Sequence, residues 1–68
     1  MAETLHLNEQ RLPCPPGLTV AELLRQQGLD GRRVATAVNG SFVPRERREQ
    51  HTLRAGDQVL TFQAIVGG

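Results

Sequence analysis

The most evident chemical feature of this sequence is the diglycine at its end, Gly67-Gly68. Neither residue has a Cβ atom, so no side chain flanks the terminal carboxylate and the backbone can adopt conformations closed to other residues. Such an end adds no packing and costs conformational entropy to hold still. Two interpretations follow: a frayed terminus with two glycines by chance, or a carboxylate on Gly68 that is itself the reactive group.

Few other residues offer chemistry. Cys14 is the single cysteine, which excludes an intrachain disulfide and a paired redox or zinc motif, and we interpret it as structural. His6 and His51 are scattered, and neither has an evident nucleophile beside it. The sequence therefore predicts no catalytic residue and no metal site within the chain itself.

Length and composition restrict the class of protein. With 68 residues and a formal net charge of +1, the chain fits one small domain with little attraction to nucleic acid or membrane. Phe42 and Phe62 are its two aromatic residues, which is a poor platform for stacking bases. No apolar run approaches the roughly 20 residues of a membrane span, and no signal-peptide core opens the chain. We expect a soluble, reduced, cytoplasmic domain.

All eight basic residues are arginines, and the sequence contains no lysine. A coding bias toward GC-rich codons explains this without function. Alternatively, neutral lysine amines would attack an activated acyl group at the chain's own end, whereas arginine stays protonated and is a poor nucleophile. Both explanations stay open.

The first half of the chain predicts a hairpin and a helix. Residues 4–8 alternate apolar and polar with Leu5 and Leu7 inward, and residues 10–13 form a returning strand. Thr19 and Glu22 have the spacing of a capping box, which predicts a helix from about Val20 to Gln27. The residues expected on its inward stripe are Val20, Leu23, Leu24 and Gln27.

The second half predicts short strands joined by turns. Residues 34–38 form a β-branched run, Asn39-Gly40 is a strong hairpin signal, and residues 41–43 follow as a short strand. The alternating charges of residues 45–50 predict an exposed helical turn, whose arginines are either solvated or paired with acidic partner residues. Residues 51–53 form a short edge strand or the end of that turn. A last strand follows the turn at 54–57.

This order of elements predicts an α+β protein with a β-grasp, ubiquitin-like fold, in which a mixed sheet of four to five strands packs on one main helix. The last strand should pair with the first and lie centrally. We expect residues 1–63 to form the domain and residues 64–68 a flexible tail. One helix covers one face of the sheet, so we place Phe62 on the uncovered face and expect it to dock a partner together with Leu60.

Several segments together resemble the ThiS family, the sulfur carriers of thiamine biosynthesis. The family shows a V/I-N…V-P-R block, a G-D turn and a tail close to F-Q-x-I-x-G-G. The matching stretches are Val38-Asn39-Gly40-Ser41-Phe42-Val43-Pro44-Arg45-Glu46, Gln50-His51, and Gly56-Asp57 through Phe62-Gln63-Ala64-Ile65-Val66-Gly67-Gly68. The N-terminal hairpin is only generically similar, and Cys14 matches no family motif.

The resemblance implies a carrier that is acted on by enzymes and is not itself an enzyme. An E1-like adenylating enzyme would use ATP and magnesium to adenylate the carboxylate of Gly68, and this chain would bind no cofactor. Sulfur from a donor such as a cysteine desulfurase would then give a thiocarboxylate, which serves thiazole synthase. Phe62 and Leu60 would dock while the tail enters the partner's active site through Ala64, Ile65, Val66 and Gly67.

Three alternatives remain open at this point. A sulfur carrier with another client, in molybdopterin synthesis or tRNA thiolation, shares the fold and the diglycine. A ubiquitin-like modifier that conjugates to lysines also ends in diglycine. A TGS-like β-grasp binding module would leave the tail inert, although near-neutral charge and scarce aromatic residues argue against nucleic acid as its ligand.

Overall fold

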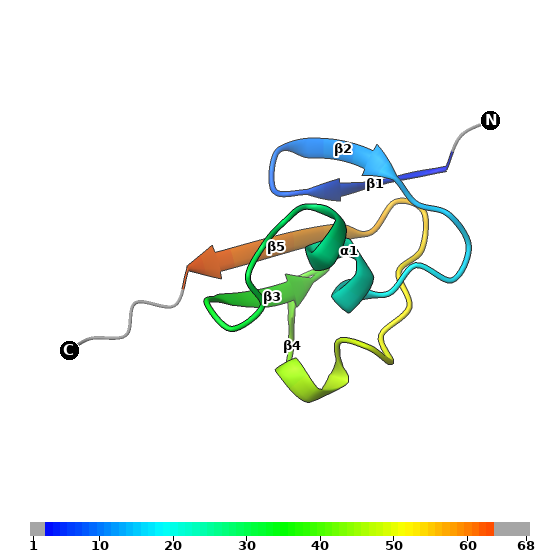
Figure 1. Ribbon diagram of the computed structural model, residues 1–68. Helices are drawn as coiled ribbons and strands as arrows, with labels where there is room; N and C mark the ends of the chain where they lie inside the picture. The colour runs from blue at the N-terminus through cyan, green and yellow to red at the C-terminus, as the bar shows by residue number, and fades with distance from the viewer. Residues whose placement is uncertain (1–2, 64–68) are drawn as a thin grey trace.

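The computed structural model describes residues 3–63, which form a five-stranded mixed sheet and one α-helix (Figure 1). The strands are β1 (Thr4–Leu7), β2 (Gln10–Pro13), β3 (Val34–Val38), β4 (Ser41–Val43) and β5 (Gln58–Gln63); the helices are α1 (Val20–Gln26) and the 3₁₀ turn η1 (Arg45–Arg47). The strand order is β2-β1-β5-β3-β4, with β1 and β5 parallel. This is the predicted β-grasp arrangement, with the last strand at the centre.

The β3–β4 hairpin forms because its two turn residues accept left-handed backbone angles. Asn39 and Gly40 have φ values of 52° and 84°, which suit the tight turn that matches the twist of paired strands. The turn sets the register, so Val38 lies opposite Ser41 and Val43 lies opposite Thr36. The hairpin predicted from Asn39-Gly40 is confirmed.

The helix begins where the sequence predicts. The Thr19 side chain accepts a hydrogen bond from the Glu22 amide at 3.2 Å, which satisfies one of the free donors at the helix start. The reciprocal half of the expected capping box is replaced, because the Glu22 carboxylate contacts Arg25 at 2.6 Å. Val20 is fully buried and fixes the helix on the core.

The helix ends one residue earlier than predicted. Gln27 is the C-terminal cap and is exposed, so its predicted place on the inward stripe is wrong. The chain turns away there because Gly28 adopts φ 68° and the Leu29 amide donates back to the Leu24 carbonyl at 2.9 Å. Leu29 then packs against the core.

The segment between β4 and β5 differs in part from prediction. The helical turn is η1, but Arg48, just after it, is buried, so the expectation of an exposed turn through residue 50 is wrong there. In residues 51–53, Thr52 makes an isolated bridge to Thr19, with no named strand. The Leu53 amide donates to the Leu18 carbonyl at 2.7 Å, which holds the segment against the start of α1.

The core lies between α1 and one face of the sheet (Figure 1). Val59 on β5 is 0% exposed and stands in register with Leu7 on one side and Val38 on the other. The core residues are Leu5, Leu7, Cys14, Leu18, Val20, Leu23, Leu24, Val38, Val43, Leu53 and Val59. β5 therefore joins the two hairpins through one shared row of side chains.

Leu23→Ala should lower the free energy of unfolding by about 2–5 kcal/mol, because it removes a buried side chain and leaves a cavity in a small core. Urea unfolding measures this change. The matched control on the same helix is Gln26→Ala, which is exposed and should change the free energy by at most about 0.5 kcal/mol. Equal effects of the two substitutions would contradict the core described here.

Candidate functional site

The structure describes the chain up to Gln63, the last residue of β5. The tail predicted to carry the chemistry therefore lies outside the described residues: Ala64, Ile65, Val66, Gly67 and Gly68. What the structure does show is the strand from which this segment leaves and the sheet face beside it.

The uncovered face of the sheet carries an apolar cluster that crosses three strands. In the β3–β5 register Ala37 lies opposite Leu60 and Ala35 opposite Phe62, and in the β3–β4 register Ala37 lies opposite Phe42. Residues opposite one another in a sheet share a face. The open-face patch therefore consists of Ala35, Ala37, Phe42, Leu60 and Phe62.

Two aromatic rings dominate the open-face patch. Phe42 is 66% exposed and Phe62 is 53% exposed, while Leu60 is half-buried. Within residues 3–63 these two are the exposed large hydrophobic side chains. The predicted exposure of Phe62 is confirmed, and a contiguous apolar surface of this kind favours contact with another protein.

The sequence predicts a short strand at Phe42 but does not place this residue on the uncovered face. The signal was present, because a two-residue Asn39-Gly40 turn fixes Val38 opposite Ser41 and hence Ala37 opposite Phe42. The β5 register was also needed to bring Leu60 alongside. That pairing is long-range and cannot be read from the local pattern.

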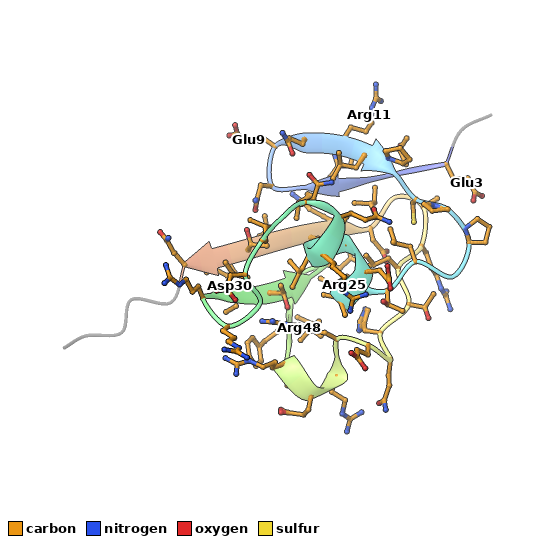
Figure 2. The ribbon with its side chains drawn as sticks, viewed as in Figure 1. Glu3, Glu9, Arg11, Arg25, Asp30 and Arg48 are labelled. Atoms are coloured by element: carbon orange, nitrogen blue, oxygen red, sulfur yellow. The ribbon has the colours of Figure 1, made fainter. Side chains whose placement is uncertain are left out.

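Polar residues border the open-face patch on the β1–β2 side. His6 lies opposite Gln58 on β5 and opposite Arg11 on β2, so all three share the uncovered face. Figure 2 shows Arg11 projecting away from β2 into the surroundings. The apolar part of the face is thus confined to β3, β4 and β5.

Side chains fix the position at which β5 begins. The Asn39 amide group donates to Asp57 Oδ1 at 3.0 Å, and Asn39 Oδ1 accepts from the Gln58 amide at 2.9 Å. Asp57 Oδ2 also accepts from the Arg54 amide at 2.9 Å. These contacts tie the turn before β5 to the β3–β4 turn.

A second pair of contacts fixes β5 where β1 ends. Asn8, at φ 55°, turns the chain away from β5, and its Oδ1 accepts from the Thr61 amide at 3.0 Å. Its Nδ2 donates to Thr61 Oγ1 at 3.0 Å. The side chain of Asn8 therefore takes the place of the next β1 residue, and β5 continues beyond it toward Gln63.

Cys14 is buried in the core and lies in the connection between β2 and α1. Burial raises the pKa of its thiol, and the negative charges of Asp57 and Glu3 raise it further. A thiol with a raised pKa is a poor nucleophile near neutral pH. This environment agrees with the structural role expected for Cys14.

Over residues 3–63, no three or more histidine, cysteine, aspartate or glutamate side chains are grouped so that they could hold a metal ion. The helices of that same range are also too short or too polar to cross a membrane. The geometry of the described part shows the open-face patch and, beside it, the strand β5, which ends at Gln63.

The model of the family described as the ThiS family matches residues 1–68. The chain belongs to the ThiS family. The chain is 49% identical over 63 residues to the sulfur carrier protein ThiS of Escherichia coli strain K12, which covers 90% of this chain and 92% of that protein. It is also similar to the crystal structure of the thiamine biosynthesis protein ThiS from Geobacter metallireducens, with a TM-score of 0.81 and 26% identity over 96% of this chain and 99% of that one.

Membership of the ThiS family confirms the resemblance first carried by the V-P-R block, the G-D turn and the F-Q tail. The match to the Geobacter structure agrees with the β-grasp fold described here.

Cys14 should react with iodoacetamide at least about tenfold more slowly in the native protein than in urea, because its thiol is buried and its pKa is raised. Mass spectrometry of quenched samples gives both rates. Equal rates in both states would contradict the buried placement.

The raised pKa of Cys14 also makes stability depend on pH. The folded state holds the thiol proton more tightly than the unfolded state, so the thiol's contribution to the free energy of unfolding is lost as pH rises above the pKa of the unfolded thiol.

Proposed function

We propose that this chain is a sulfur carrier in thiamine biosynthesis, whose Gly68 carboxylate is activated by an E1-like adenylating enzyme and converted to a thiocarboxylate. The observation that carries the proposal is the membership of the ThiS family over the whole length of the sequence. The diglycine that follows β5 and the open-face patch beside that strand support it. The chain acts in the cytoplasm as a carrier for partner enzymes.

The chemistry requires activation because a carboxylate is a poor electrophile. The partner enzyme uses ATP and magnesium to form an acyl-adenylate on Gly68, releasing pyrophosphate. A sulfur nucleophile then attacks the acyl carbon, and the carbon–sulfur bond forms as the bond to AMP breaks. Where a cysteine desulfurase supplies this sulfur as a persulfide, the product is an acyl disulfide. A thiol then attacks the desulfurase sulfur, so that a new disulfide forms and the thiocarboxylate leaves.

The thiocarboxylate is anionic at neutral pH and nucleophilic at sulfur, which suits transfer to thiazole synthase. Gly67 and Gly68 let the partner close around the backbone, because no Cβ atom keeps it away. In the sequence, Ala64, Ile65 and Val66 lie between Gln63 and the diglycine. The proposed role of this segment is to bring the acyl carbon into line for attack.

The folded domain supplies recognition. Phe62 and Leu60 dock on the adenylating enzyme, and the geometry adds Phe42, which is the more exposed of the two aromatic residues. Aromatic side chains at the centre of an interface contribute much of its binding free energy. The patch adjoins the end of β5, so docking here directs the following segment into the partner.

Gly68→Val should lower the rate of adenylation by about a hundredfold, because a branched side chain displaces the acyl carbon from its place in the partner site. The assay combines the chain with its cognate adenylating enzyme, ATP, magnesium and sulfide, and intact-mass spectrometry detects the replacement of one oxygen by sulfur. Circular dichroism should show an unchanged fold. Normal conversion of this variant would refute the role of Gly68.

The same assay separates the competing functions. Thiocarboxylate formation supports a carrier, whereas isopeptide adducts on lysines support a ubiquitin-like modifier. Removal of Gly67-Gly68 without any effect on partner binding would support an inert tail. Co-purification with thiazole synthase, as opposed to the large subunit of molybdopterin synthase, identifies the client.

Phe62→Ala should weaken binding to the adenylating enzyme by about thirtyfold, because it removes an aromatic side chain from the docking face. Isothermal titration calorimetry measures the Kd. The control, Gln26→Ala, lies on α1 across the core from this face and should leave the Kd unchanged. Unchanged affinity of a folded Phe62→Ala protein would show that the partner binds elsewhere.

A further inference from the structure

Arg48 is an arginine held almost entirely inside the protein. It follows η1 and is only 6% exposed. Its Nη1 donates to the Gly31 carbonyl at 2.7 Å and its Nη2 donates to the Val34 carbonyl at 2.6 Å, while Nε has no partner. Figure 2 shows Arg48 between η1 and the strands beneath α1.

The charge of Arg48 is compensated by carbonyl groups alone in the part of the chain described. The ion pairs found in residues 3–63 are Arg25–Glu22 and Arg33–Asp30, and neither involves Arg48. Burial lowers the pKa of its guanidinium, and the neighbouring charge of Arg45 lowers it further. A buried cation without a carboxylate is costly, so the burial of Arg48 calls for a geometric reason.

The geometric reason is the planar fork of the guanidinium, which bonds two carbonyls at once. One belongs to the loop after α1 and the other to Val34, the first residue of β3. Gly31 permits the contact, because a Cβ atom there would lie 3.0 Å from Arg48 Nη1. Arg48 thus fastens the beginning of β3 to the η1 segment.

The beginning of β3 is also the place where β5 ends. Val34 lies opposite Gln63, the last pair of the β3–β5 register. On the other side of β5, pairing with β1 reaches only Leu7↔Val59, after which the Asn8 side chain holds Thr61. Beyond Thr61, β3 is therefore the sheet neighbour that β5 retains within the described residues.

We propose that Arg48 is a positioning residue: by fastening Val34 it fixes the end of β5 at Gln63, and so sets the direction in which the chain leaves toward Gly68. The inference rests on the proposed function, because that direction matters only if the end of the chain is delivered to a partner site. Arg48 itself touches no reacting atom.

The test compares Arg48→Met, which keeps length and loses the fork, with Arg45→Met. Arg45 is exposed and reaches the Arg32 carbonyl at 3.4 Å, so it is the matched control. In the free protein, hydrogen exchange of the Ala35 and Phe62 amides should become about tenfold faster in Arg48→Met, while the Val59 region keeps its protection. Arg45→Met should match the unchanged protein.

The second readout is the kinetics of adenylation. The docking face is intact in Arg48→Met, so KM should change little while kcat falls by about tenfold or more, because the acyl end is presented in the wrong direction. Arg48→Lys retains the charge but lacks the planar fork, so its kcat should lie between that of Arg48→Met and that of the unchanged protein. A purely stabilising role would lower the melting temperature and leave kcat of the folded fraction unchanged.

If Arg48→Met does not fold, Gly31→Ala tests the positioning role of Arg48. The added Cβ would lie 3.0 Å from Arg48 Nη1, so the fork must shift by a few tenths of an ångström while the arginine itself is kept, and both effects should recur more weakly. Unchanged local exchange and unchanged kcat in a folded Arg48 or Gly31 variant, or equal effects in Arg45→Met, would overturn the proposal. Lack of any adenylation of the unchanged protein would instead refute the proposed function, while the exchange result would still report on Arg48.

Discussion

The pairing of β5 with β1 on one side and β3 on the other is the constraint on which the rest of this structure depends. The β1–β2 and β3–β4 hairpins have no direct pairing with each other in the sheet order, and β5 joins them. Val59, at the middle of this join, is fully buried beneath α1. The same strand carries Leu60 and Phe62 on its uncovered side, so one element completes the core and contributes to the open-face patch.

The alternation of β5 explains how so short a strand serves both purposes. Successive side chains point to opposite faces, so Val59 enters the core while Leu60 and Phe62 stand on the open face. On the same face, β3 carries the small side chains of Ala35 and Ala37, which lie between Phe42 of β4 and the larger side chains of β5. Polar residues His6 and Arg11 limit the apolar area on the other side.

The features that the sequence predicts well are those set by local chemistry. The Thr19 cap, the Asn39-Gly40 turn and the alternation of Leu5 and Leu7 depend on residues near one another, and each forms as expected. The central place of the last strand follows from the order of elements in the β-grasp arrangement. The exposure of Phe62 follows from one helix covering one face.

The features that escape sequence reasoning depend on distant partners. The charges around Arg48 suggest a solvated turn, and only the carbonyls of Gly31 and Val34 show why that arginine is buried. Gln27 is a local exception: it fits the helical period, but as the cap of α1 directly before Gly28 it is exposed. Phe42 joins the open-face patch through two strand registers. The predicted roles of residues 64–68 lie outside the part that the structure describes.

The parallel pairing of β1 with β5 has a mechanical consequence. Strands that run in the same direction place the start of β1 and the end of β5 at opposite ends of the pair. If the chain is pulled at Gln63 and held at the start of β1, the force acts along the two strands. It therefore loads the β1–β5 hydrogen bonds in shear, all together, and does not open them one by one. The β1–β5 pair should therefore resist a force applied to the last strand better than a pair that opens one hydrogen bond at a time.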